Sequence, residues 1–376
     1  MMLCYKNVRS FDEGFPEYNP DWMLRDINGT IISHVGATTF LKITDPLNQE
    51  YWAYLRDWFQ TRQNEGYSGI YHDNGVTIEI NTQWGYTGWP VNPRTPGQLY
   101  LESQYVADCT TLGNWLVTQF PNMYHAANGF WNGSLYLNEQ PNFDYVIANS
   151  AMNCIMSEGM WGNMYGILYT ETEWKRSLNF LRHLQDAWIG QGRDFMTYTN
   201  CRGAETRDQG SGVGIIGWER SAHFQFNSAL LAVTRPQRNY LSMHRCMSEQ
   251  LVQDYFKVDV GFPEEEYYEL LGSGIYTRKW SKVQPFVNPG IITKMVNVAA
   301  MNLYDALGVP VSTVILKAKD GILLYQEPLT FSLLSYRSNP PGIAITVDGV
   351  PLQDGEQIEA PTGTVVVLKA EKKIEG

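Results

Sequence analysis

Two acidic residues occupy comparable places in the sequence. Asp73 follows the apolar pair Ile-Tyr at 70–71 in the segment GYSGIYHDNG, and Glu158 follows the apolar run at 154–156. An apolar run that ends on polar residues is typical of a buried parallel strand whose carboxyl end opens onto a functional rim. A simple turn is the alternative for Asp73, because Asp-Asn-Gly also favours turns, and a surface carboxylate is the alternative for Glu158.

The spacing of the two carboxylates suits one particular chemistry. A βα unit takes roughly 30–40 residues, so the two strands should lie one or two apart on the same rim. Two carboxylates that face each other there are what glycoside hydrolysis requires. One stabilises or covalently traps the oxocarbenium-like carbon, and the other protonates the leaving oxygen. Apolar surroundings would raise the pKa of Glu158, as a general acid needs.

Aromatic and polar residues near the same strand ends could bind a sugar. Tryptophans on rim loops could stack on sugar rings, although packing in the core or in a loop is the alternative for each of them. Amides and hydroxyls at strand ends could bind sugar hydroxyls or cap loops. The candidate substrate-binding residues are His72, Asn74, Trp84, Asn128, Trp131, Trp161, Tyr198 and Asn200.

The elements that must position these residues alternate between helix and strand. In 48–64 the apolar residues recur at spacings of three and four, which predicts an amphipathic helix, and further helices are expected at 98–120, 172–190 and 225–233. Each precedes or follows an apolar strand that ends on polar residues. We therefore predict an α/β fold of the (β/α)8 TIM-barrel type. A doubly wound open sheet is the rival, but no GxGxxG motif follows any strand.

The sequence changes character beyond about residue 285. Short β-type runs at 311–317, 322–325, 329–335, 343–350 and 364–369 are separated by turn residues, with one helical patch at 296–307. We predict two domains, a catalytic barrel over 1–285 and a small antiparallel β-sandwich-like domain over 286–376.

Composition excludes several classes of function. The formal net charge is −11, without basic clusters, which disfavours nucleic-acid and anionic-membrane partners. Aromatic residues make up 13% of the chain, which suits a protein that binds a ligand such as a sugar. A well-packed, aromatic-rich core is the alternative explanation. The five cysteines show no metal-ligand spacing, so neither a metal site nor a cofactor is expected. Neither a signal peptide nor a transmembrane segment is apparent, which leaves export by another route or membership of a larger particle open.

Several short motifs resemble a known family in their order and spacing. They are DWMLRD at 21–26, Asp45-Pro46, GYSGIYHDNG, Asn128-Gly129, IMSEGMW at 155–161, Tyr276-Thr277-Arg278 and Val287-Asn288-Pro289. In these motifs the chain resembles TIM-barrel glycoside hydrolases, hypothetical glycosidases related to the endo-alpha-1,4-polygalactosaminidase group. The resemblance implies that Asp73 is the nucleophile or stabilising carboxylate and that Glu158 is the general acid/base.

The chain departs from the family pattern in three places. Ser68 stands where the family has an aspartate, and His72 replaces an apolar residue beside Asp73. The chain also begins near what looks like the second strand, so the barrel is expected to be incomplete at the N-terminus, or completed by an upstream segment or another chain. The leading hypothesis is hydrolysis of a polysaccharide or oligosaccharide. The alternative is a non-catalytic carbohydrate-binding or structural protein, such as a surface or virion component, with homo-oligomers and larger assemblies left open.

Overall fold

The structure is a computed structural model of the 376-residue chain. It describes residues 2–34, 39–78, 80, 86–130, 133–162, 168–200, 217–244 and 258–328, together with the short strand segments 207–208, 214–215, 331–335, 345–347, 350–352, 357–361 and 369–370.

A parallel sheet forms the centre of the N-terminal part. Its strands, in spatial order, are β1 (Leu3–Asn7), β4 (Gly69–Asp73), β5 (Tyr124–Asn128), β6 (Cys154–Glu158), β7 (Asp194–Asn200) and β10 (Asn239–His244). All neighbouring pairs are parallel, and spatial order follows chain order. A doubly wound sheet reverses its order at a switch point, whereas a barrel does not. The predicted α/β barrel type is therefore confirmed, with β1 and β10 as the outermost strands of the described sheet.

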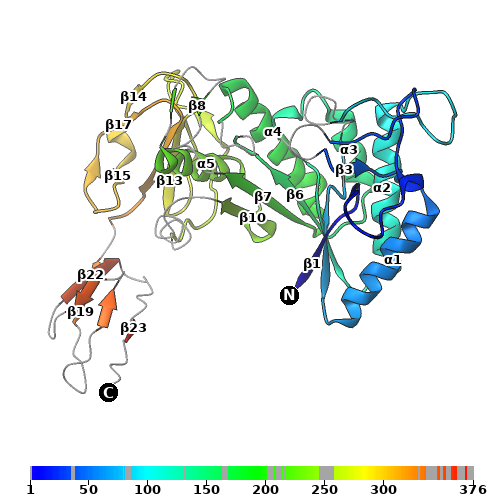
Figure 1. Ribbon diagram of the computed structural model, residues 1–376. Coiled ribbons are helices and arrows are strands. Elements are labelled where there is room, and N and C mark those ends of the chain that lie inside the picture. The colour runs from blue at the N-terminus through cyan, green and yellow to red at the C-terminus, as the bar shows by residue number, and fades with distance from the viewer. Residues whose placement is uncertain are drawn as a thin grey trace.

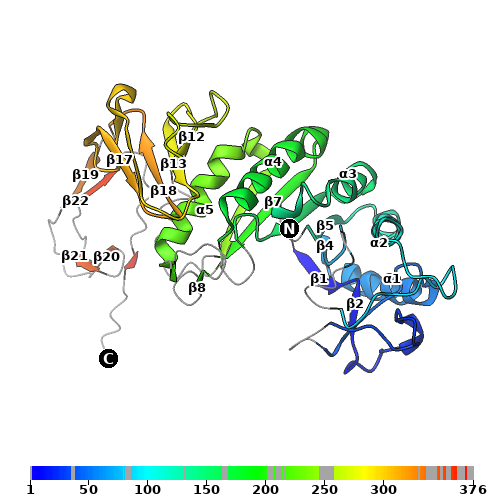
Figure 2. The same ribbon diagram turned by 90° about the horizontal axis from the view of Figure 1, so that it is seen from above.

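Helices connect these strands and cover one face of the sheet (Figures 1 and 2). They are α1 (Gln49–Asn64), α2 (Glu102–Gln119), α3 (Gln140–Asn149), α4 (Glu171–Ala187) and α5 (Trp218–Ala232). The Asn48 side chain caps α1 by accepting a hydrogen bond from the backbone of Tyr51. Thr170 and Glu173 form a capping box at the start of α4. Three of the predicted helices thus begin and end within four residues of their expected bounds.

Alternate residues of each strand face opposite sides of the sheet. In β4, Ile70 and His72 face the helices, and Ile70 packs in a buried cluster with Phe59 of α1 and with Phe120. Tyr71 and Asp73 therefore face the other, helix-free side. This division decides which residues of a strand can meet a ligand.

Short elements complete the N-terminal part. They are β2 (Ser10–Asp12), β3 (Leu41–Ile43), β8 (Arg207–Asp208), β9 (Gly214–Ile215) and the 3-10 turns at Pro20–Trp22, Gly133–Leu135, Ile189–Gln191 and Pro236–Arg238. Strand β2 follows β1 directly and pairs with β3 in antiparallel fashion.

The C-terminal part is antiparallel, as predicted. One sheet has the order β11 (Tyr268–Glu269), β12 (Tyr276–Thr277), β13 (Val283–Asn288), β18 (Asp320–Tyr325), β15 (Leu303–Tyr304) and β16 (Pro310–Val311). Strands β14 (Lys294–Asn297) and β17 (Thr313–Leu316) form a separate pair. Beyond them follow β19 (Phe331–Ser335), β20 (Ile345–Val347), β21 (Val350–Leu352), β22 (Gln357–Pro361) and β23 (Lys369–Ala370).

This antiparallel sheet begins earlier than the sequence suggested. Strands β11 and β12 precede residue 286, and β13 runs across the expected boundary. The expected helical patch at 296–307 is wrong. It contains the end of β14, a single 3-10 turn at Ala299–Met301 and strand β15, because cross-strand pairing prevails over the local helical pattern.

The antiparallel sheet packs against α5 of the barrel part. Arg278 donates hydrogen bonds of 3.0 Å to the carbonyl oxygens of Leu231 and Val233 at the end of α5, and the indole of Trp280 donates to that of Leu230. Cations favour the carboxyl end of a helix, where carbonyl groups lack partners. Arg278, which belongs to the Tyr276-Thr277-Arg278 motif of the family resemblance, therefore connects the antiparallel sheet to α5 in this chain.

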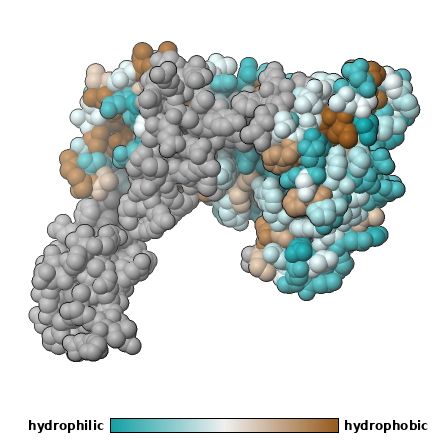
Figure 3. Space-filling model, in the orientation of Figure 1, coloured by the Kyte–Doolittle hydropathy of each residue, from teal (hydrophilic) through white to brown (hydrophobic). Residues whose placement is uncertain are grey.

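The surface view shows hydrophilic residues over much of α1 and α2 and hydrophobic patches over the β14 and β17 region (Figure 3). In that region Met295 and Ile315, which are direct cross-strand partners, are more than half exposed. No helix within the described ranges is long and apolar enough to cross a membrane.

Candidate active site

Three neighbouring strands end on polar residues on the helix-free face. Asp73 ends β4, Asn128 ends β5 and Glu158 ends β6. Strand β5 lies between the other two, so the carboxylates are two strands apart, within the range expected from their spacing. Asp73 and Glu158 thus lie at the same rim of the sheet, with one amide between them.

Asp73 accepts hydrogen bonds from three side chains. Its Oδ2 accepts from the Tyr5 hydroxyl at 2.5 Å and from Nδ2 of Asn7 at 3.3 Å, and its Oδ1 accepts from Nδ2 of Asn128 at 3.2 Å. Donors on both oxygens fix the carboxylate plane. The position of this carboxylate is therefore determined by residues of β1 and β5 as well as by its own strand.

The turn at Asp-Asn-Gly also exists, but it does not use the Asp73 side chain. The backbone N–H of Gly75 donates to the carbonyl of His72 at 3.0 Å, and Asn74 adopts a left-handed φ of 53°. Asn74 tolerates this region better than most residues. The motif therefore forms its turn through the backbone and leaves the Asp73 carboxylate free to take part in the site.

Asn128 lies between the two carboxylates. Its Nδ2 donates to Oδ1 of Asp73 at 3.2 Å, and its side chain, acting as a donor, lowers the pKa of Glu158. Asn128 thus acts on both carboxylates from the strand that separates them.

The electrostatics of the rim favour a protonated Glu158. Burial raises the pKa of Glu158, the hydrogen bond from Asn128 opposes this, and the negative charge of Asp73 raises it further. Burial also raises the pKa of the Tyr71 hydroxyl, as do the charges of Glu158 and Asp73. Tyr5 and Tyr71, which stack with ring centroids 5.9 Å apart, therefore remain neutral hydrogen-bond donors.

Removing the hydroxyl of Tyr5 gives a first test of this arrangement. Tyr5→Phe keeps the ring but removes the shortest hydrogen bond to Asp73, and it should lower any activity that depends on Asp73 by about 10- to 100-fold. The comparison is the ratio of kcat/KM between wild type and variant on the same substrate. A variant with full activity would show that the Tyr5 hydroxyl has no part in the site.

His72 is not brought to this rim. Its ring is fully buried on the helix side, where Nε2 lies 2.9 Å from Nδ1 of His125 and the two rings stack. Nε2 of His125 donates to the carbonyl of Phe120, so Nδ1 of His125 accepts the proton of His72. The alternation of side chains explains this placement, since neighbours in a strand face opposite sides.

The histidine pair should make the fold sensitive to acid. Burial lowers the pKa of both rings below the ordinary 6.5, and His125 further lowers that of His72. Below pH 6.5 the unfolded chain therefore binds protons that the folded chain excludes, and stability falls as the pH falls. The free energy of unfolding, measured by denaturant titration between pH 7 and 5, should fall by up to about 1.4 kcal/mol per pH unit for each histidine.

The double variant His72→Leu/His125→Leu supplies the control for this pH effect. Its unfolding free energy should depend less on pH over the same range, whatever its stability at pH 7. An equal slope in both proteins would assign the acid sensitivity to other groups.

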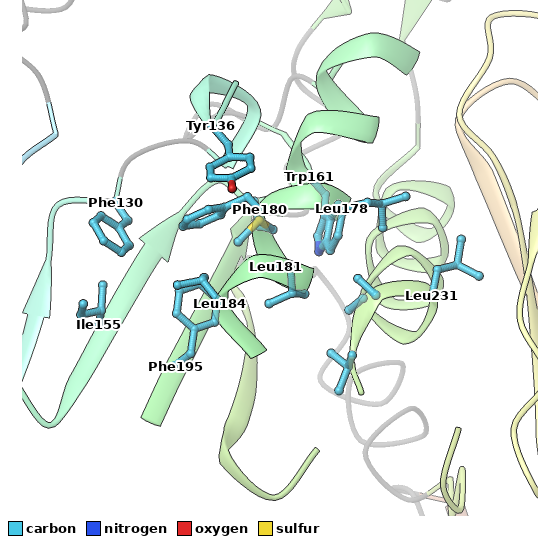
Figure 4. Packing of buried hydrophobic residues seen from close by; sticks show 14 of the residues in the cluster. Phe130, Tyr136, Ile155, Trp161, Leu178, Phe180, Leu181, Leu184, Phe195 and Leu231 are labelled. Atoms are coloured by element: carbon cyan, nitrogen blue, oxygen red, sulfur yellow. The ribbon is translucent and has the colours of Figure 1, made fainter. Parts of the chain in front are cut away.

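The remaining candidate residues fall into four groups. Trp161 is fully buried, and Figure 4 shows it in the cluster that Leu178 and Phe180 of α4 also form. Tyr198 of β7 is in direct register with Glu158 and thus on the same face, and Asn200 ends that strand. Trp84 and Trp131 lie outside the described residues. Asn74 is buried beside Asp73.

Sequence reasoning missed Tyr5, Asn7 and Tyr71. Strand β1 runs from Leu3 to Asn7, which pairs with Asp73. Its end, Tyr-x-Asn, is a polar strand end of the same kind as that of β4, and this is the signal in the sequence that could have located these residues. Ser68, by contrast, lies at the opposite end of β4, where it hydrogen-bonds the backbone of Met2.

The described residues contain no group of three or more His, Cys, Asp or Glu side chains that could hold a metal ion.

No protein-family model and no curated protein sequence matches the chain. Solved structures do resemble it. One is Ega3 of Aspergillus fumigatus in complex with galactosamine, at 13% identity over 64% of this chain and 73% of that one, with a TM-score of 0.35. Another is the glycoside hydrolase domain of PelA from Pseudomonas aeruginosa, at 15% identity over 66% and 79%, also with a TM-score of 0.35. A third is the type III pullulan hydrolase of Thermococcus kodakarensis, at 11% identity over 86% and 59%, with a TM-score of 0.45. Structural neighbours of the chain are thus glycoside hydrolases, the class that its sequence motifs resemble.

Proposed function

We propose that the chain hydrolyses glycosidic bonds of a polysaccharide or oligosaccharide, with Asp73 and Glu158 as its two working carboxylates. The observation that carries this proposal is the placement of Asp73 and Glu158 at the ends of the two strands that flank β5, at one rim of the parallel sheet, with Asn128 of β5 acting on both. Two carboxylates at one rim, in different environments, are the minimum that the reaction needs.

The two carboxylates have different roles in the proposed reaction. Glu158, whose pKa is raised by burial, gives its proton to the leaving glycosidic oxygen as the bond to the anomeric carbon breaks. Asp73 traps the anomeric carbon covalently or stabilises its positive charge, and water completes the hydrolysis. Tyr5, Asn7 and Asn128 hold Asp73 in place during this step.

Asn128 also has a free acceptor. Its Oδ1 is buried and has no hydrogen-bond partner among the described residues. A buried acceptor without a partner is costly, and a sugar hydroxyl at the rim would satisfy it. This supports the prediction that Asn128 contacts substrate, and Tyr198 beside Glu158 is placed to contribute a second polar contact.

The experiment that tests the proposal is a screen of the purified chain against neutral, acidic and amino-sugar polysaccharides, with release of reducing ends as the measure. Activity on one of them that disappears in Asp73→Asn and Glu158→Gln supports the proposal. Binding of a glycan without any release of reducing ends, unaffected by either substitution, would favour a carbohydrate-binding protein instead.

A further inference from the structure

The chain leaves β6 through a turn directly after Glu158. Gly159 has a φ of 82°, in the left-handed region that glycine tolerates best, and its N–H donates to the carbonyl of Tyr198 at 2.9 Å. The next two residues, Met160 and Trp161, are fully buried. Because Glu158 immediately precedes this turn, whatever holds Gly159 in place also determines where the Glu158 carboxyl lies.

Tyr169 closes the loop that follows this turn. Its hydroxyl donates to the carbonyl oxygen of Gly159 at 2.7 Å, and its N–H donates to that of Trp161 at 3.3 Å. Between these two contacts, Gly162 and Leu168 pair in antiparallel fashion. The Tyr169 side chain is buried, and a buried hydrogen bond is costly to leave unmade. Tyr169 therefore holds the backbone directly after the end of β6.

Lys319, which lies just before β18 in the C-terminal part, holds Tyr169 in turn. Its Nζ donates to the carbonyl oxygens of Tyr169 and Pro289, and the lysine is fully buried. Burying an ammonium group is costly unless it is hydrogen-bonded, as it is here. Lys319 also has a φ of 51°, which is uncommon for a residue other than glycine. Residues held in such conformations are found most often at functional sites.

A second contact joins the antiparallel sheet to the same segment. The Tyr276 hydroxyl of β12 donates to Oε1 of Glu171 at 3.0 Å, and the ring of Tyr276 lies with its centroid 5.0 Å from that of Trp174. Glu171 and Trp174 belong to the start of α4. The C-terminal part thus contacts both the start of α4 and Tyr169, which ends the loop that follows β6.

We propose that Tyr169 and Lys319 are positioning residues of the site: the lysine holds Tyr169, whose hydroxyl holds the backbone at Gly159 and so determines where the Glu158 carboxyl lies. This inference rests on the proposed function in that Glu158 is taken as the general acid. The C-terminal part is then a component of the active site and not only a support for the barrel.

Two substitutions interrupt this chain of contacts, and each has a matched control. Tyr169→Phe removes the hydroxyl that holds Gly159. Tyr124→Phe removes a comparable hydroxyl at the opposite end of the sheet, where Tyr124 donates to Asp194 at 2.6 Å. Lys319→Met removes the buried ammonium group, and Lys317→Met removes an exposed one two residues away.

The first measurement requires no activity. It is the pH titration of the Glu158 carboxyl in the full chain, followed by 13C NMR of the glutamate side chains and assigned by the signal that Glu158→Gln lacks. Burial is the main cause of the raised pKa of Glu158. A carboxyl that is held less firmly admits water, so Tyr169→Phe and Lys319→Met should lower this pKa towards its ordinary value of 4.5, and the two controls should leave it unchanged.

Activity provides the second measurement. On the substrate found in the screen, Tyr169→Phe and Lys319→Met should lower kcat by about 10-fold with KM little changed, because Glu158 is displaced from the leaving oxygen while the binding contacts remain. The alkaline fall in activity should also move to lower pH, together with the pKa of Glu158. A loss of stability alone moves neither the NMR titration nor the pH profile of the folded enzyme.

A folded Tyr169→Phe protein with the wild-type titration of Glu158 would overturn the proposal, as would an equal shift in Tyr124→Phe. A folded Lys319→Met protein with that titration unchanged would remove the lysine from it. If Lys319→Met does not fold, Lys319→Gln takes its place under the same outcomes, since its amide keeps donors for the carbonyl groups.

The outcomes also separate this inference from the proposed function. A shifted titration in Tyr169→Phe without any hydrolysis by the wild type would refute the hydrolase and leave the positioning of Glu158 standing. Hydrolysis by the wild type with an unshifted titration in Tyr169→Phe would do the reverse.

Discussion

Asp73→Asn is expected to lower the rate of glycoside hydrolysis by about 10⁴-fold or more, in line with the loss of a principal catalytic group in other enzymes. The amide has nearly the same shape as the carboxylate, but it carries no negative charge to trap or stabilise the anomeric carbon. It also presents an NH2 group to donors, so at least one contact from Tyr5, Asn7 or Asn128 must change. The measurement is kcat/KM on the substrate found in the screen.

The control for this loss is Asp186→Asn. Asp186 is 87% exposed on α4 and pairs loosely with Arg235, so its substitution should leave both activity and stability close to wild type. An Asp73→Asn protein that is folded and retains more than a small fraction of the activity would contradict the role given to Asp73.

Glu158→Gln is expected to lower activity by about 10²- to 10⁴-fold, the usual contribution of a general acid. The loss should be smaller on aryl glycosides with acidic leaving groups, because such leaving groups need little protonation. The pH dependence has a defined sign. Since burial raises the pKa of Glu158, the proton it donates is kept to higher pH, and activity should fall on the alkaline side as that proton is lost.

Glu50→Gln is the matched control, an exposed glutamate in the first turn of α1. The Glu158→Gln protein should lose the alkaline fall in activity that the wild type shows. The free energy of unfolding of Glu158→Gln, measured relative to that of the wild type, should also increase from acid to neutral pH. A carboxyl with a raised folded-state pKa loses stability as the pH rises above its unfolded value, and the amide does not titrate. An alkaline limb that persists unchanged in Glu158→Gln would assign that limb to another group.

The sequence reveals those parts of the fold that local patterns determine. Apolar runs with polar ends located β4 and β6, and spacings of three and four located α1, because each of these elements buries a continuous face. The same rule predicts Asp73, Asn128 and Glu158 at strand ends, where the structure has them. In these cases the apolar pattern of a single element is sufficient to predict where that element lies and where it ends.

The parts that could not be predicted depend on pairing between distant segments. Tyr5 and Asn7 belong to the site only because β1 lies beside β4, 66 residues away in the chain, in a register that aligns Asn7 with Asp73. For His72, alternation along β4 alone predicts a side chain on the face opposite Asp73, which is where the structure has it, buried against His125.

Asn128 makes the effects of substitutions at Asp73 and Glu158 depend on each other. Its side chain donates to Asp73, and both Asn128 and Asp73 act on the pKa of Glu158, so a substitution at Asp73 should also be felt at Glu158. Their mutational effects should therefore be non-additive, with a coupling energy that a double-mutant cycle can measure and that Asn128→Ala should reduce. In the proposed reaction the acid and the second carboxylate would then evolve together, since a change in one alters the energetic contribution of the other.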